Sequence, residues 1–252
     1  MKILLTNDDG IYAEGLLALF KEIKTMGSVT VVAPDSQRSS VGHGITLGSP
    51  VIARKITTPK GISGIGLTGT PADCVKFALK RVLKSKPDIV VSGINLGPND
   101  GCSVFYSGTV AGAREASLYG IPAIAFSLNT FVNPDFRYAA RFAKKMIKQV
   151  LVKGLPRETF LSVNVPALKP NNIKGVRITR QGKVPIVTRF LKIKRSKDDE
   201  SLSFWMTGDT PKREKSRDID TVALNQGYIT VTPIQNDLTS YHALAQMANW
   251  RL

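Results

Sequence analysis

Short apolar runs alternate with amphipathic stretches along most of the chain. The runs predict buried strands at residues 3–5, 29–33, 88–92, 121–127 and 160–165. Between them, apolar residues recur with the spacing of one helix face, which predicts helices at residues 16–23, 70–83, 107–119 and 138–151. Strands that alternate with helices form crossover units. We therefore expect an α/β fold with a mostly parallel sheet and helices on both faces.

The pattern changes after Pro166. Residues 171–240 carry short β-prone runs and a further predicted strand at 228–232, with basic side chains among them: Lys192, Lys194, Arg195, Lys197, Lys212, Arg213, Lys215 and Arg217. This pattern indicates exposed hairpins rather than more crossover units. We expect a single domain over residues 1–252, with a core at 1–170, a hairpin-rich segment at 171–240 and a terminal helix at 241–252.

Composition narrows the class of protein. Lys and Arg number 35 against 19 Asp and Glu, a net charge of +16 that attracts polyanions without identifying one. Two cysteines exclude a disulfide scaffold. No apolar run approaches the roughly 20 residues that span a bilayer, and Asp8 comes too early for a signal peptide. The sequence predicts a soluble cytoplasmic protein with no membrane partner.

Asp8 and Asp9 directly follow the first predicted strand, at the edge where parallel sheets bind ligands. Gly10 permits a bend that turns both carboxylates to one cleft, where their repulsion calls for a cation, a shared proton or hydrogen bonds. Carboxylates with Ser and Asn oxygens suit Mg²⁺, Mn²⁺ or Ca²⁺ better than zinc. The alternative is that both residues cap the next helix or face water.

The triplet Ser107-Gly108-Thr109 opens a predicted helix. Backbone N–H groups at a helix start bind anions, and a glycine lets the ligand approach closely. The plainer interpretation is an ordinary Ser or Thr N-cap. A divalent ion beside an anion cradle is what phosphoryl chemistry requires.

Two other features have competing interpretations. His43 lies between glycines in a loop, where it either donates a proton to a leaving group or is a surface residue. Residues 64–69 match the dinucleotide fingerprint G-x-G-x-x-G, but they lie far from the first strand and no acid follows at the right place. We therefore expect no dinucleotide site there.

At these positions the chain resembles the SurE family, the survival-protein E nucleotidases. The matching stretches are residues 3–10, 33–35 with Arg38 and Ser39, 69–75, 91–97 and 106–110. They occur in the family's order over about the first half of the chain. Two departures are Ser40, where the family often has glycine, and the high positive charge.

The resemblance implies a Rossmann-like core and a metal-dependent phosphomonoesterase that acts on nucleoside 5′- and 3′-monophosphates. It implies one divalent ion per subunit, Mg²⁺ or Mn²⁺, on Asp8, Asp9, Ser39 and Asn95. The phosphate would lie on Asn95 and the turn Ser107, Gly108 and Thr109. The C-terminal hairpins would build a homodimer or homotetramer, with no specific nucleic-acid partner.

The resulting hypothesis is hydrolysis by water activated by an ion on Asp8 and Asp9, with His43 as proton donor to the departing ribose oxygen. Three alternatives remain. A haloacid-type phosphatase would use Asp8 as nucleophile, but it needs an acid where this chain has Gly10. A polyanion-binding protein would use the basic segment 183–217. A purely structural oligomer would leave the acids at the strand ends unexplained.

Overall fold

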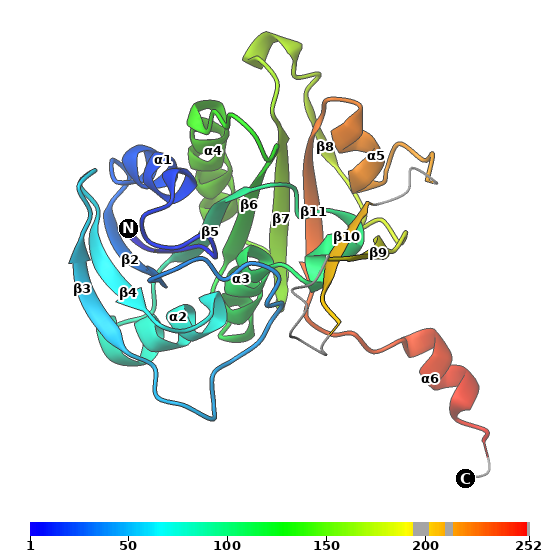
Figure 1. Ribbon diagram of the computed structural model, residues 1–252, viewed down its shortest axis with the longest axis horizontal. Helices are drawn as coiled ribbons and strands as arrows, with labels where there is room; N and C mark the ends of the chain where they lie inside the picture. Colours follow the sequence, from blue (N-terminus) through cyan, green and yellow to red (C-terminus); the bar gives the residue numbers. More distant parts are fainter. Residues whose placement is uncertain (194–201, 210–213, 251–252) are drawn as a thin grey trace.

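A nine-stranded mixed sheet forms the centre of the protein in the computed structural model, which describes residues 1–193, 202–209 and 214–250 (Figure 1). The strand order is β3-β4-β2-β1-β5-β6-β7-β11-β8. The bounds are β1 Lys2–Thr6, β2 Ser28–Pro34, β3 Ala53–Thr57, β4 Ser63–Leu67, β5 Ile89–Leu96, β6 Ala123–Asn129, β7 Thr159–Pro166, β8 Val176–Ile178 and β11 Ile229–Gln235.

The strands from β4 to β7 in this order are parallel, which confirms the predicted α/β fold. β3 pairs antiparallel with β4, and β11 pairs antiparallel with β7. From β1 the chain passes to β2, then to the edge strand β3 and back to β4 beside β2, and it returns to β5 on the other side of β1. The strand order therefore reverses between β1 and β5. The carboxyl ends of these two strands form the crevice where open parallel sheets bind ligands.

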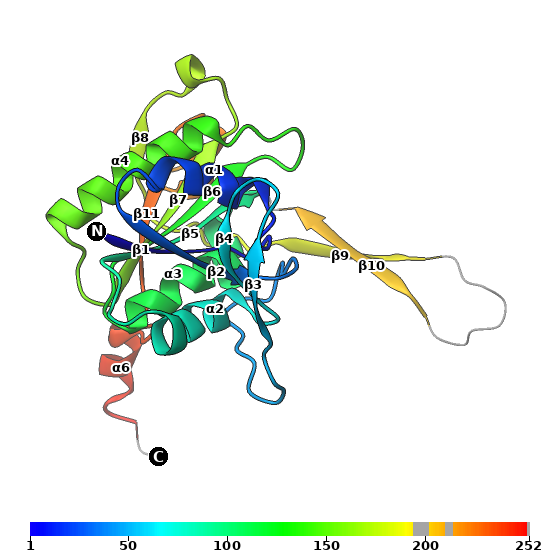
Figure 2. The same cartoon turned by 90° about the vertical axis from the view of Figure 1, so that its left-hand side faces the viewer.

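Two layers of helices cover the sheet (Figure 2). α1 (Glu14–Ile23) and α4 (Arg137–Lys153) pack on one face, and α2 (Pro71–Phe77) and α3 (Gly108–Leu118) pack on the other. In β1, Ile3 and Leu5 join the first layer's core, whereas Leu4 joins the second. Burying each such side chain contributes about 1.5–3 kcal/mol. This is why the predicted strands are continuous apolar runs.

The segment with the dinucleotide-like glycines is strand β4 and the turn that follows it. A Cβ on Gly64 would lie 2.7 Å from the Val31 carbonyl oxygen, so this glycine allows close strand packing. The turn leads to α2, where Thr70 is the N-cap: its hydroxyl accepts from the Asp73 N–H at 3.1 Å, and the Asp73 carboxylate accepts from the Thr70 N–H. The glycines therefore serve packing.

The sheet continues past the core boundary predicted at residue 170, because β11 and β8 add to it beyond β7. The sequence of β11 alternates apolar and polar residues, which suggested an exposed hairpin. Its polar Thr232 is nevertheless buried, and its hydroxyl pairs with that of Thr179 at 2.8 Å. The segment's described hairpin is an arm of β9 (Val187–Lys192) and β10 (Phe204–Asp209), which projects from the body in Figure 2.

Several predicted basic residues of this segment lie outside the described residues: Lys194, Arg195, Lys197, Lys212 and Arg213. The predicted terminal helix is α6 (Tyr241–Met247), which stands away from the sheet in Figure 1, and α5 (Asp220–Asn225) precedes β11. Among the helices in the described parts of the chain, none has both the length and the apolar character needed to cross a bilayer.

Candidate active site

Asp8 lies at the carboxyl end of β1 and packs against the first turn of α3. Its side chain is buried, and its Oδ1 accepts a hydrogen bond from the Thr109 hydroxyl. A Cβ on Gly108 would lie 2.8 Å from the Asp8 Cβ and 3.0 Å from its Oδ2. Glycine at this position is therefore what lets the helix terminus and the carboxylate meet.

Burial makes the charged forms of both acids unfavourable. It raises the pKa of Asp8 from 3.8 to about 6; the charge of Asp9 adds to this rise, and the Thr109 hydrogen bond opposes it. Burial also raises the pKa of Asp9, whose Oδ2 accepts from the Leu96 N–H at 3.1 Å. In the described parts of the chain, neither carboxylate forms an ion pair with Lys or Arg. A bound cation would supply the missing charge.

Neutral oxygens lie beside this acid pair. Asn95 donates its Nδ2 to the Gly97 carbonyl at 2.8 Å, which leaves its Oδ1 available, and its neighbour Leu96 is bonded to Asp9. The pairing of β5 with β6 shifts register between Ser92 and Asn95, and such an irregularity bends the end of the strand that carries Asn95. The strand-end position of Asn95 was predictable, but the irregularity was not.

The residue before Ser39 connects this loop to the crevice, because the Arg38 N–H donates to the Asp8 carbonyl at 2.7 Å. The Ser39 side chain is exposed and accepts from Gln37 Nε2 at 2.8 Å. Ser40 has φ 58°, a left-handed conformation that favours glycine. Serine at this position therefore adopts a backbone conformation that glycine would adopt without strain.

The donor set fits a hard cation. The described residues contain no group of three or more His, Cys, Asp or Glu side chains arranged to hold a metal. The crevice instead offers the carboxylates of Asp8 and Asp9 together with neutral oxygens, the combination that Mg²⁺, Mn²⁺ and Ca²⁺ prefer. Next to Asp8, the buried Oδ1 of Asn7 also has no hydrogen-bond partner among the described residues.

The predicted anion turn is partly occupied by the protein's own groups. Ser107 is the N-cap of α3, since its Oγ accepts from the Val110 N–H at 3.0 Å. The Thr109 hydroxyl is buried and donates to Asp8. The N-cap interpretation of Ser107 is therefore confirmed. What remains for an anion is chiefly the backbone N–H at Gly108.

His43 lies away from the acid pair, on a network that the sequence did not reveal. Its Nε2 is 2.8 Å from Oε2 of Glu115, a buried side chain of α3, and Lys76 Nζ is 2.5 Å from the other carboxylate oxygen. Hydrogen bonds from His43 and Lys76, together with the charge of Lys76, lower the pKa of Glu115 against the opposing effect of burial. Glu115 follows Ser107 by two helical turns, about 12 Å along α3. In the sequence, the one sign of this network was Glu115, a single acidic residue in an alanine-rich helix.

Further contacts hold the loop between β2 and β3 to α2. Thr46 donates to Asp73 through its N–H at 3.1 Å and its hydroxyl at 2.7 Å. Thr70 Oγ1 donates to the Gly44 carbonyl at 2.7 Å. The loop that carries Ser39 is therefore fixed at several points, and His43 is one of them.

Two other strand-end residues have structural surroundings. Asn99 exchanges hydrogen bonds with Asn164 in the interior. Asp100 lies near Asp220, which accepts from the N–H groups of Gly101 and Gly182 and so ties the base of the arm to the sheet. Burial, with the charge of Asp220 as a smaller cause, raises the pKa of Asp100 from 3.8 to about 6.

Comparison with known proteins gives a consistent result. The family model described as Survival protein SurE matches residues 3–187. A protein of Carboxydothermus hydrogenoformans named 5′-nucleotidase SurE is 44% identical over 99% of this chain and 96% of its own. One of the same name from Syntrophus aciditrophicus is 43% identical over 97% and 91%. The crystal structure of the SurE protein from Aquifex aeolicus superposes with a TM-score of 0.84 at 39% identity, covering 98% of both chains.

The raised pKa of Asp100 predicts a pH-dependent cost to stability. The folded chain binds the Asp100 proton more tightly than the unfolded chain, so stability falls as the pH rises from 3.8 to about 6. Asp100→Asn removes this cost, and we expect it to gain about 2–3 kcal/mol relative to wild type between about pH 4 and pH 7. Urea unfolding across this range measures the difference.

The matched control has the opposite sign. Hydrogen bonds from Ser216 and Arg180 lower the pKa of the exposed Asp218 below 3.8, so Asp218→Asn should lose stability relative to wild type only as the pH rises to about 4, and its difference should be flat between about pH 4 and pH 7. A flat difference for Asp100→Asn over the same range would contradict the interpretation of its surroundings.

Proposed function

Because the chain belongs to the SurE family, we propose that it is a metal-dependent phosphomonoesterase that hydrolyses nucleoside 5′- and 3′-monophosphates to nucleoside and phosphate. The observation that carries the proposal is the pair Asp8 and Asp9, with raised pKa values and no cationic partner among the described residues, at the reversal point of the sheet. The relatives named 5′-nucleotidase support the substrate class.

We assign the cation site to Asp8, Asp9, Asn95 and Ser39, with Mg²⁺ or Mn²⁺ as the ion. When bound there, such an ion supplies positive charge to the phosphate and lowers the pKa of water. The Gly108 N–H and the second N–H of Asn95 Nδ2 donate to phosphate oxygens, and the Asn95 Oδ1 faces the cation. The partial positive charge of the α3 N-terminus adds to their effect.

The proton steps follow from the surroundings of each group. Asp9 is only partly buried and its Oδ2 accepts from the Leu96 N–H, so we assign its carboxylate to orient the attacking water and accept its proton. Asp8 is held by Thr109 and stays in place. We assign His43 to anchoring the Ser39 loop, because Glu115 holds its Nε2, and the departing ribose oxygen then takes its proton from solvent.

Removal of either acid tests this function. We expect Asp8→Asn and Asp9→Asn to lower kcat/KM for nucleoside monophosphates by about 10³-fold, since charge at the reacting phosphate is lost. The measurement is phosphate release from 5′ and 3′ esters in EDTA and after Mg²⁺ or Mn²⁺ is restored. Asp88→Asn is the control and should keep its activity, because Asp88 precedes β5 and so lies at the amino end of the strand, away from the crevice. Metal-independent turnover, or active Asp variants, would contradict the assignment.

The anchoring role of His43 predicts a particular kinetic pattern. His43→Gln and Glu115→Gln should weaken activation by Mg²⁺ about tenfold while kcat at saturating Mg²⁺ changes little, since they loosen the loop that carries Ser39. Calorimetric titration with Mg²⁺ without substrate checks the same loss. A large fall in kcat with unchanged Mg²⁺ affinity would instead make His43 the proton donor.

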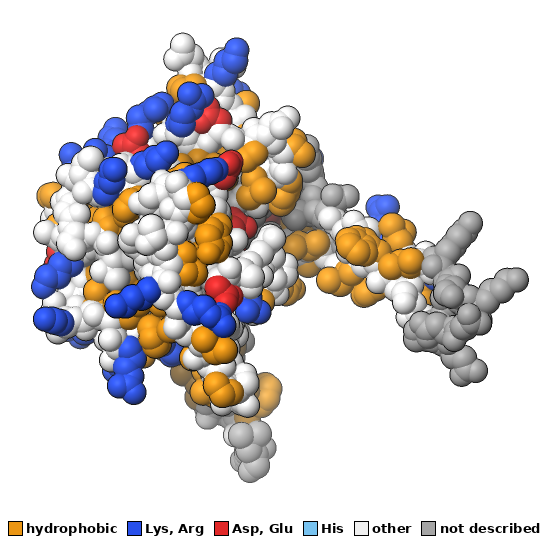
Figure 3. All heavy atoms as spheres, turned by 60° about the vertical axis from the view of Figure 1, so that its left-hand side comes forward, with side chains coloured by type: hydrophobic (Ala, Val, Ile, Leu, Met, Phe, Trp, Pro, Cys, Tyr) orange, Lys and Arg blue, Asp and Glu red, His pale blue; other side chains and the backbone are white. Residues whose placement is uncertain are grey.

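We also propose that the arm joins copies of this chain into a homodimer or homotetramer. Directly paired residues share a face of the hairpin: Phe190 lies opposite Met206, and Leu191 lies opposite Trp205. All four are exposed, so both faces of the arm carry apolar side chains. Figure 3 shows hydrophobic side chains along the face of the arm that is turned toward the viewer. Apolar surface on both sides favours a protein partner over a polyanion.

A charge on one face of the arm should separate the copies. We expect Phe190→Glu with Met206→Glu to be a monomer by light scattering, whereas wild type is a dimer or tetramer. Val152→Glu is the control, because Val152 is also an exposed apolar residue but lies at the end of α4. A monomeric wild type, or an unchanged double variant, would show that the arm does not assemble the protein.

A further inference from the structure

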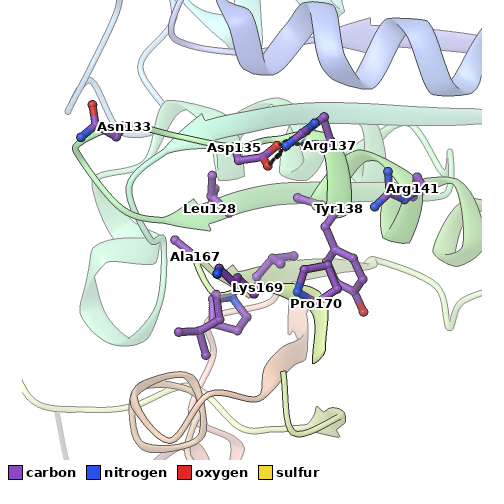
Figure 4. Close-up of a pocket in the computed structure, with 13 residues that line it drawn as sticks. Leu128, Asn133, Asp135, Arg137, Tyr138, Arg141, Ala167, Lys169 and Pro170 are labelled. Carbon is purple, nitrogen blue, oxygen red and sulfur yellow. Dashed lines mark hydrogen bonds and ion pairs between the residues drawn. The ribbon is translucent and has the colours of Figure 1, made fainter. Parts of the chain in front are cut away.

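A cavity of about 570 Å³ lies on the carboxyl edge of the sheet, beyond the ends of β6 and β7. We call it the α4 cavity; the residues that define it here are Leu128, Arg137, Tyr138, Arg141, Lys169 and Pro170. Figure 4 shows side chains of α4 on one side and those of the segment after β7 on the other. Its volume is in the range of pockets that hold small organic molecules.

The charges around the α4 cavity favour an anion. Arg137 and Arg141 are four residues apart and so lie on the same side of α4, and Lys169 adds a third cation. The one lining carboxylate, Asp135, is held by Arg137, with Nη2 to Oδ2 at 2.6 Å. In the described parts of the chain, neither Arg141 nor Lys169 has a carboxylate partner.

The rest of the lining suits a ring attached to that anion. The phenol ring of Tyr138 and the ring of Pro170 give apolar walls, and Leu128 lies between the two sides. Aromatic side chains stack on flat rings and bind them without demanding one hydrogen-bond pattern. The first-turn N–H groups of Tyr138 and Ala139 lack acceptors within α4 and add to the pull on negative charge.

We propose that the α4 cavity is a second binding site, for a phosphate monoester of the nucleotide class, separate from the crevice at Asp8 and Asp9. The phosphate lies on Arg141 and Lys169, and the base or sugar lies between Tyr138 and Pro170. The proposal does not depend on the proposed catalysis, since none of these residues takes part in it.

A physical connection links the two sites. The loop between β6 and α4 lines the cavity through Asn133 and Asp135. The Phe131 ring of this loop packs on Gly97, where a Cβ would lie 2.3 Å from it. The Gly97 carbonyl in turn accepts from Asn95. A ligand in the α4 cavity therefore touches the same loop that packs beside the catalytic crevice.

Photolabelling with 8-azidoadenosine 5′-monophosphate tests the proposal, carried out in EDTA and followed by peptide mapping. We expect label in peptides that contain Tyr138 or Lys169, competed by adenosine 5′-monophosphate. Arg141→Ala with Lys169→Ala should reduce this label about tenfold or more, because both phosphate contacts are lost. Lys145→Ala with Lys148→Ala removes the same charge from exposed positions of α4 and should leave it unchanged.

Label confined to peptides of the crevice, or cavity label that survives Arg141→Ala with Lys169→Ala, would overturn the proposal. Equal loss of cavity label in both double variants would mean that the label depends only on the net charge of the protein, and this result would also overturn the proposal. Hydrolysis of adenosine 5′-monophosphate, measured in parallel with Mg²⁺, separates the two questions. Failure of the second site leaves this activity intact, and failure of the proposed function leaves the cavity label intact.

Discussion

Placing the Asp8 carboxylate out of water and beside a second carboxylate raises the free energy of the folded protein unless positive charge is brought to it. The surrounding structure compensates this cost in part. The Thr109 hydroxyl binds the carboxylate, Gly108 lets the helix terminus approach it, and the β5 strand brings the Leu96 N–H to Asp9. A divalent cation bound by the two carboxylates would offset the rest of this free-energy cost.

The elements around this pair differ in how firmly they are held. β1 and β5 are central strands, with cores on both faces. The loop that carries Ser39 has no such support, and it is fixed to α2 and α3 by Thr46, Thr70 and His43. Asp8 and Asp9 are therefore held by the core, whereas the loop that carries Ser39 is held by polar contacts. The loop side of the site can adjust while the two acids stay in place.

Much of the fold was predictable because the central strands are buried on both faces and read as apolar runs, as at residues 3–5. β3 and β4 were missed, since β3 is largely exposed and β4 is rich in glycine. The strand-end positions of Asp8, Asp9 and Asn95 follow from the strand pattern alone, and their role in binding a cation stays a proposal. The contact of His43 with Glu115 spans 72 positions and leaves no periodic signal, so only the folded chain reveals it.

The two edges of the sheet explain why the arm, and not the sheet, is the surface that joins copies in our proposal. An exposed strand edge is a template for another strand and therefore a risk of aggregation. Here one edge is β3, which carries the charged side chains of Arg54 and Lys55, and the other is β8, only three residues long. Both edges resist uncontrolled strand addition. Self-recognition is thereby left to one hairpin with a defined pairing, which favours closed assemblies over open-ended fibres.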